Sequence, residues 1–270
     1  MENKTQALAS LNIPRSSFYY HSFKDIGDAT LKALVESTLE KHPSYGSRRI
    51  ALTLAMNRKK VTRVMRKFDL RPRRSRKSPK YKHNRDRAEI SPNLLVSLTP
   101  LFKNHLWVTD FTYIKWHGRF IYLATIIDLY TREVVGIAIK TNHSSLLVTE
   151  AILNALAGEG TPSIVHSDQG SEYCSKLFRF VLSDFSVLQS MSAKSSPWQN
   201  GYQESFYGNF KVDIGDVNRY ATLAGLISEL YRSIYYYNYH RIHLALGCPP
   251  KTFATRAATK YTALQEIHAV

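Results

Sequence analysis

The sequence predicts a mixed α/β domain of about 150 residues that follows a small, basic, all-helical region. Three observations predict this organisation. Basic residues are concentrated before Pro100, three strand-like runs come in close succession after it, and helical patterns then alternate with one more short strand. This order of elements is typical of a mixed sheet covered by helices, which makes the fold class α/β.

Composition and charge limit the class of protein. The chain has 270 residues, 44% of them hydrophobic, and a formal net charge of +16. This apolar content supports a core and excludes disorder throughout. Two cysteines, Cys174 and Cys248, are too few for a disulfide framework, which favours a reducing compartment. No apolar stretch approaches the roughly 18–20 residues of a membrane span. We therefore expect a cytoplasmic, nucleoid-associated protein without a membrane partner.

The excess of basic residues lies in the N-terminal part. Up to Pro100 there are 22 basic and 8 acidic residues, against 15 and 13 in the rest of the chain. A basic run is often only a solvated helix face or a targeting address. Here the run continues from a patterned helix into a Pro-punctuated linker, which favours a nucleic acid as the partner.

Two short helices are predicted in this basic region. One runs from Ser47 to Met56 after a break at Gly46, and the second runs from Arg58 to Phe68 with Asn57 as its N-cap. Apolar residues of the second helix recur at helical spacing, and basic residues occupy its other faces. A basic second helix after a tight turn is typical of a helix-turn-helix. The predicted DNA contacts here are Arg48, Arg49, Arg58, Lys59, Arg63 and Lys67.

Two further segments belong to the N-terminal part. The stretch from Ala7 to Tyr19, with Pro14 suited to a first helical turn, forms a partial helix-turn-helix that lacks a covering helix. This suggests that the chain works within a larger assembly. The following linker can track a phosphate backbone, with Arg73 and Arg74 as candidate contacts. The predicted boundaries are 1–25 for the partial helix-turn-helix, 26–70 for the helix-turn-helix region, 71–99 for the basic linker, 100–256 for the core and 257–270 for a tail.

The core elements follow from residue patterns. Three strands with short connections, the first of them a turn at His117-Gly118, predict an antiparallel meander. The predicted strands are Leu106 to Trp116, Phe120 to Asp128, Val134 to Lys140 and Ile164 to His166. The predicted helices are Ser144 to Ala157, Glu172 to Phe185, Gln199 to Asp213 and Leu223 to His240.

Three acidic residues stand in unusual settings. Asp110 is in the middle of a strand, where a charge opposes strand propensity; Asp168 directly follows a short buried strand; and Glu204 is on a helix. Each alone has an ordinary explanation, as an ion-pair partner, a turn residue or a surface residue. Together they can converge, and converging carboxylates without a His/Cys set suit hard divalent cations such as Mg²⁺. Two such ions can promote an in-line displacement at a phosphodiester.

The motifs around these acids resemble a known family. W-V-T-D-F-T-Y around Asp110, H-S-D-Q-G-S-E-Y around Asp168 and N-G-Y-Q-E-S-F around Glu204 resemble the DDE catalytic core of bacterial insertion-sequence transposases, in the retroviral-integrase superfamily. More narrowly, the chain is similar to the second-reading-frame (OrfB) product of those elements. His42 to Ile50 resembles the preceding helix-turn-helix module, and Tyr237 to Pro250 resembles the usual ending of the core.

The resemblance implies a ribonuclease-H-like integrase catalytic core and two Mg²⁺ or Mn²⁺ ions bound by Asp110, Asp168 and Glu204. It also implies nicking of the element ends, followed by attack of a 3′-hydroxyl on target DNA. The expected partners are DNA, further copies of the chain in a synaptic complex, and a helix-turn-helix protein from an upstream reading frame or a fusion to it. The zinc module and the C-terminal barrel of retroviral integrases are absent from this sequence.

Other residues near the motifs have weaker assignments. Lys211 lies two helical turns after Glu204, where it is expected to hold a DNA phosphate; an exposed helix lysine is the alternative. Asn200 is expected to shape the loop before the glutamate, and Trp198 to touch DNA. The residues Gly201-Tyr202-Gln203 differ from those that most commonly precede the glutamate in this family's motif.

Several residues are expected to be structural. Asp128 is interpreted as a turn residue and not as a ligand, and His166 either lies near the site or packs in the core. The cysteines are interpreted as inert, and the tyrosines from Tyr235 to Tyr239 as core residues and not as a stacking platform for bases. Two alternatives of function stay open: a nuclease of the same fold that only hydrolyses DNA, and a DNA-binding regulator that needs no metal.

Overall fold

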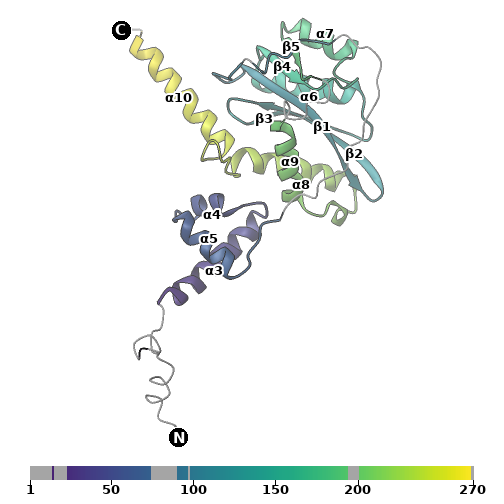
Figure 1. The fold of residues 1–270 in the computed structure, drawn as a ribbon. Coiled ribbons are helices and arrows are strands. Elements are labelled where there is room, and N and C mark those ends of the chain that lie inside the picture. Colours follow the sequence, from purple (N-terminus) through teal and green to yellow (C-terminus); the bar gives the residue numbers. More distant parts are fainter. Residues whose placement is uncertain (1–13, 15–22, 74–89, 97, 194–200, 269–270) are drawn as a thin grey trace. The chain divides into compact units, whose positions relative to one another are not determined.

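The computed structural model describes residues 14, 23–73, 90–96, 98–193 and 201–268 (Figure 1). The chain divides into two compact units, Met1–Pro72 and Arg73–Val270. The fragment from Ala7 to Leu11, Arg74, Trp198 and Asn200 fall outside the described residues. Among the residues that are described, no helix is both long and apolar enough to cross a bilayer.

In its described residues, the first unit contains helices α3 (Phe23–Lys41), α4 (Ser47–Thr53) and α5 (Arg58–Lys67). Asn57 caps α5 as predicted, because its side chain accepts a 2.8 Å hydrogen bond from the amide of Lys59. The apolar stripe of α5 is buried, together with Leu31 and Val35 from α3. The sequence interpretation did not assign α3, and it extended α4 by three residues beyond its observed end.

The second unit is built on one five-stranded sheet with the order β3-β2-β1-β4-β5 (Figure 1). Strands β1 (Leu106–Trp116), β2 (Arg119–Asp128) and β3 (Val134–Lys140) form the predicted antiparallel meander, whereas β4 (Ile164–Ser167) and β5 (Leu188–Met191) run parallel to β1. This is the ribonuclease-H-like arrangement that the resemblance implies. The sequence interpretation omitted β5, whose four residues carry no clear apolar alternation.

The β1–β2 turn has the geometry that the sequence predicts. His117 and Gly118 both have positive φ, 41° and 77°, between the paired residues Trp116 and Arg119. A two-residue loop with positive φ at both positions matches the right-handed twist of the flanking strands. The meander is therefore fixed locally, before any helix packs on it.

Helices cover both faces of the sheet (Figure 1). One hydrophobic cluster joins the sheet to α6 (Ser145–Glu159) and α7 (Lys176–Asp184), and the other joins it to α8 (Gly201–Ile214) and α9 (Leu223–Tyr239). On the first face α6 lies very close to β3, because a Cβ at Gly136 would stand 2.4 Å from the carbonyl oxygen of Ala151. A short 3-10 helix, Val217–Arg219, connects α8 to α9.

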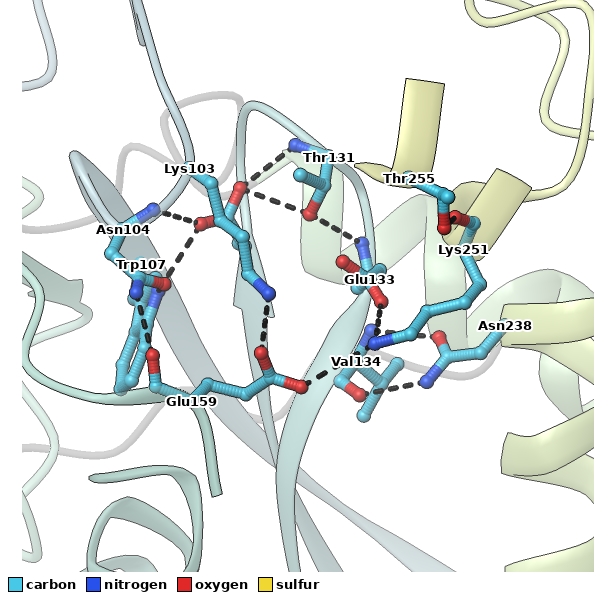
Figure 2. Close-up of polar contacts among 11 residues, drawn as sticks. Lys103, Asn104, Trp107, Thr131, Glu133, Val134, Glu159, Asn238, Lys251 and Thr255 are labelled. Atoms are coloured by element: carbon cyan, nitrogen blue, oxygen red, sulfur yellow. Dashed lines mark hydrogen bonds and ion pairs between the residues drawn. The ribbon is translucent and has the colours of Figure 1, made fainter. Parts of the chain in front are cut away.

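Helix α10 (Pro250–His268) follows α9 and includes residues 257–268 of the segment expected as a tail. Its first turn is attached to the core by Lys251, whose ammonium pairs with Glu133 at 2.9 Å and lies 3.6 Å from Glu159 (Figure 2). Glu133 is almost fully buried, so Lys251 supplies a positive partner to a carboxylate that has left water. The start of α10 is thereby fixed to the end of the meander.

Candidate active site

The candidate site forms where β1 separates from β4. The ladder between these strands contains only three pairs, the last of which joins Val108 to His166. Asp110 therefore lies two residues beyond the ladder, on the part of β1 that pairs only with β2 in the described structure. Its Oδ1 accepts a 2.8 Å hydrogen bond from the amide of Phe111.

Asp168 directly follows β4, which places it at the same end of the separating strands. The amide of Gly170 donates a 2.8 Å hydrogen bond to Asp168 Oδ1 and so orients the carboxylate. A Cβ at position 170 would stand 2.9 Å from that oxygen and 3.2 Å from Oε2 of Glu172. A larger residue here would therefore displace the Asp168 carboxylate from the orientation that the Gly170 amide gives it.

Glu204 lies in the first turn of α8, with its side chain exposed. Two buried residues on the same helix hold it to the strands of the sheet. Gln203 donates to the carbonyl of Val108 at 2.9 Å, and the Tyr207 hydroxyl donates to the carbonyl of Asp110 at 2.7 Å. The sequence interpretation assigned no role to either residue. A signal was present, because both polar side chains stand on the apolar stripe formed by Phe206, Phe210 and Ile214.

The charges of Asp168 and Glu204 both act on the carboxylate of Asp110. Burial raises the pKa of Asp110 well above its usual value, and the negative charges of Asp168 and then Glu204 raise it further, against the lowering effects of the Phe111 amide and Lys211. Burial also raises the pKa of Tyr173, and the charges of Asp110 and Asp168 add to that effect. A carboxylate under such influences is a functional-site candidate.

The positions of the carboxylates do not by themselves form a chelating cluster. Within the described part of the chain, no three His, Cys, Asp or Glu side chains are close enough together to hold one metal ion. The chemistry of the donors nevertheless fits a hard divalent cation, since the charges of Asp168 and Glu204 both act on the Asp110 carboxylate and the opposing effect of Lys211 is the smallest of those on its pKa.

Lys211 lies on the same helix as Glu204, two turns farther along, and is half-buried. Its ammonium stands 5.0 Å from the centre of the Tyr113 ring. Burial lowers the pKa of Lys211, whereas the nearby charge of Asp110 raises it. The residue is thus near the acids and is not a fully exposed helix lysine.

Asp128 is a turn residue, which confirms its interpretation. Its carboxylate is fully buried and accepts five hydrogen bonds: from the amide of Asn104 at 2.6 Å, the indole of Trp107 at 3.2 Å, the amides of Tyr130 and Thr131 at 2.9 and 2.8 Å, and the Thr131 hydroxyl at 3.1 Å. No acceptor capacity remains for a metal.

The structural interpretation of the other residues is confirmed for some of them and wrong for others. His166 packs in the core, where Nδ1 lies 2.8 Å from the Ser190 hydroxyl and burial lowers its pKa to about 4. Burial raises the pKa of Cys174, which keeps the thiol protonated. Core packing is confirmed for Tyr237 but is wrong for Tyr235 and Tyr239, which are exposed and stack on each other with ring centres 4.4 Å apart.

The Arg and Lys residues that the sequence predicts as DNA contacts differ in their partners and exposure. Arg63 and Lys67 both pair with Asp28, a buried residue of α3, with a distance of 3.2 Å for Lys67. Arg49 lies over the ring of Tyr45 at 5.6 Å. The remaining residues of the predicted set in the described chain are exposed: Arg48, Arg58, Lys59 and, in the second unit, Arg73.

Comparisons with known proteins identify relatives of this chain. Two models of the integrase core domain match residues 102–197 and 186–250. The transposase for insertion sequence element IS904 of Lactococcus lactis is 34% identical over 239 residues, which cover 83% of this chain and 92% of that protein. The transposase InsF for insertion sequence IS3A of Escherichia coli is 32% identical over 160 residues, 58% of this chain and 56% of that protein.

Among solved structures, the HTLV-2 integrase catalytic core domain is 19% identical, with a TM-score of 0.49, and the match covers 58% of this chain and 99% of that one. The extent and identity of the match to the IS904 protein show the family. The chain therefore belongs to the insertion-sequence transposases of the second-reading-frame type, which carry an integrase core domain.

Proposed function

We propose that this transposase uses Asp110, Asp168 and Glu204 to hold Mg²⁺ or Mn²⁺ and to nick element ends and join them to target DNA. The observation that supports the proposal is the raised pKa of Asp110, to which the charges of both other acids contribute. Like charges gathered around a buried carboxylate destabilise the protein unless a cation joins them. We expect two cations to bind, and the acids to move closer together around them.

In this proposal the carboxylates and Lys211 have different roles. The three carboxylates supply the ligands, and Lys211 holds a phosphate of the DNA next to them. Bound divalent cations would activate the attacking hydroxyl and stabilise the leaving oxygen of the displacement. The Phe111 amide donates to Oδ1 of Asp110 and the Gly170 amide donates to Oδ1 of Asp168, and these bonds orient the two carboxylates.

The first unit would supply affinity for DNA. Arg58, Lys59 and Arg63 lie along one depression of about 450 Å³ on α5, which also contains Thr62 and Arg66. We propose Arg58 and Lys59 as phosphate contacts, since Arg63 is already paired with Asp28. Replacing both by Gln should weaken DNA binding and reduce the slope of log affinity against log salt by roughly 2. An unchanged slope would remove this face from the DNA interface.

A strand-transfer assay tests the catalytic proposal. The substrate is a duplex with a precut element end and a 3′-hydroxyl, mixed with a second, labelled duplex and either Mg²⁺ or EDTA. We expect joined products that require the metal. Asp110→Asn, Asp168→Asn and Glu204→Gln should each abolish joining while leaving DNA binding largely intact.

The same assay separates the alternatives. Metal-dependent cleavage without joined products would indicate a nuclease of the same fold that only hydrolyses DNA. Binding without any strand breakage would indicate a regulator. Size measurement of the DNA complex, with and without the product of an upstream reading frame, tests the proposed assembly of several copies and the proposed second chain.

A further inference from the structure

We propose that Gln203 and Tyr207 are positioning residues that lock helix α8 onto β1 and thereby set the placement of Glu204 relative to Asp110. The inference rests on the proposed metal-dependent activity and adds to it the groups that fix the geometry of the ligands. Neither side chain needs to touch a metal or DNA, because both act through the helix that carries Glu204.

Gln203 has every polar atom engaged by the sheet. It is completely buried, its Nε2 donates to the carbonyls of Val108 and Thr125 at 2.9 and 3.3 Å, and its Oε1 accepts from the Thr125 hydroxyl at 3.1 Å. A buried amide that loses such partners carries the full desolvation penalty of its polar atoms. Any shift of helix α8 relative to the sheet that breaks these bonds is therefore disfavoured.

Tyr207 lies one turn farther along the same face of α8. Its hydroxyl donates to the backbone carbonyl of Asp110 at 2.7 Å and stands 2.9 Å from the hydroxyl of Thr125. Thr125 is the residue directly opposite Asp110 in the β1–β2 pairing. The helix that presents Glu204 is thus bonded to the residue whose carboxylate Glu204 must face, and to that residue's partner across the ladder.

Apolar packing alone would not define this placement. Phe206, Phe210 and Ile214 bury the same face of α8, but apolar contacts are non-directional and tolerate small slides. Hydrogen bonds weaken steeply when distance or angle departs from the optimum. Two such anchors one turn apart fix both the axial position and the rotation of α8. Because a misplacement of about 1 Å can cost about 100-fold in rate, this constraint matters for catalysis.

The chain offers a matched control in Tyr237. This tyrosine belongs to the same hydrophobic cluster, is 8% exposed against 7% for Tyr207, and its hydroxyl also donates to a carbonyl, that of Arg132 at 3.1 Å. That carbonyl belongs to the turn between β2 and β3, so the bond does not join α8 to β1. Tyr237→Phe therefore removes the same kind of buried hydrogen bond without releasing α8 from Asp110.

The test compares Tyr207→Phe with Tyr237→Phe in the full chain. Both should lower the melting temperature by a similar few degrees. Only Tyr207→Phe should weaken binding of Mn²⁺ to the DNA-free protein, measured by electron paramagnetic resonance, by several-fold. Only Tyr207→Phe should slow strand cleavage at saturating DNA, by about 10- to 100-fold. Thr125→Val, which removes a hydroxyl bonded to both anchors, should give the same pattern. Equal effects of the two Tyr→Phe changes on Mn²⁺ affinity and rate would overturn the inference.

Glu204→Gln in the same assays separates this inference from the proposed function. If Glu204→Gln loses Mn²⁺ binding and cleavage while Tyr207→Phe behaves as the unaltered protein, the metal site stands and the positioning role is wrong. If Glu204→Gln keeps full metal binding and cleavage, the proposed site itself is wrong, and the positioning role with it.

Discussion

Asp110 and Asp128 stand on neighbouring strands of one sheet in opposite environments. Asp128 is surrounded by five donors, whereas the hydrogen bond described for Asp110 comes from the amide of Phe111. The closest charges to Asp110 include two further acids, and its pKa is raised. A carboxylate saturated with donors suits a structural role, whereas one left among like charges is a candidate metal ligand. The sequence interpretation placed Asp110 in the middle of a strand and Asp128 in a turn, and the surroundings of the two carboxylates in the fold distinguish them further.

The largest effect should come from Asp110→Asn. Strand cleavage and joining should fall by a thousandfold or more, on the order of the loss seen when a catalytic group is removed. Thermal stability in EDTA should stay the same or rise, because a raised pKa means that the folded state disfavours the charged carboxylate. Melting curves with and without Mg²⁺ check this, since added Mg²⁺ should stabilise only the unaltered protein. A large loss of stability in EDTA would contradict the contrast with Asp128.

Asp128→Asn should show the reverse pattern. An amide nitrogen would face donors such as the Trp107 indole or the Thr131 amide, so we expect a loss of about 2–3 kcal/mol in the free energy of unfolding. Cleavage by the molecules that remain folded should be nearly unchanged. Urea denaturation and a rate normalised to the folded fraction measure the two quantities. Loss of cleavage without loss of stability would place Asp128 in the chemistry.

Lys251→Met should have a smaller structural effect. It would leave the buried Glu133 without its ammonium partner but keep most of the aliphatic packing, so a loss of about 1–2 kcal/mol is expected. The ratio of Mg²⁺-supported to Mn²⁺-supported cleavage should not change. Lys140→Met is the matched control, because Lys140 pairs with Glu150, which is far more exposed. Equal effects of the two changes would show that burial of Glu133 is unimportant.

The titration of His166 should have the smallest effect near neutral pH, because the fold keeps the ring neutral and the effect appears only in acid. Its pKa is lowered from 6.5 to about 4 in the folded chain, so between these values the unfolded chain binds more protons. Stability should therefore fall as the pH drops from about 6.5 to about 4, by up to about 3 kcal/mol, and change little below that for this group. His166→Asn should flatten this part of the pH dependence of unfolding in urea. An unchanged profile would mean that His166 does not titrate in this range.

Most of the sheet could be predicted because its signals are local. Strands β1 and β3 have the predicted ends, and the His117-Gly118 turn follows from residue type. Strand β5 was omitted because its position depends on pairing with β4 and not on its own pattern. Helix α3 was omitted for a similar reason, since the burial of Leu31 and Val35 depends on α5.

The three acids could be proposed as site residues from their motifs, but the residues that hold the strands and helix of the site in place could not. Gln203 and Tyr207 act through carbonyls of β1 and β2, and backbone acceptors leave no trace in residue identity. The pairing of Arg63 with Asp28 depends on the packing of a helix that the sequence interpretation lacked. Tertiary contact between distant segments is the common reason for these gaps.

The separation of β1 from β4 has a consequence for the order of assembly during folding. Asp110 belongs to a meander whose contacts are short-range, whereas Asp168 and Glu204 join it only after the chain has closed much longer loops. A nascent chain that has formed only the meander would hold one of the three acids. We expect DNA-breaking capacity to be acquired last in refolding, after secondary structure, so incomplete chains pose no hazard to the genome that encodes them.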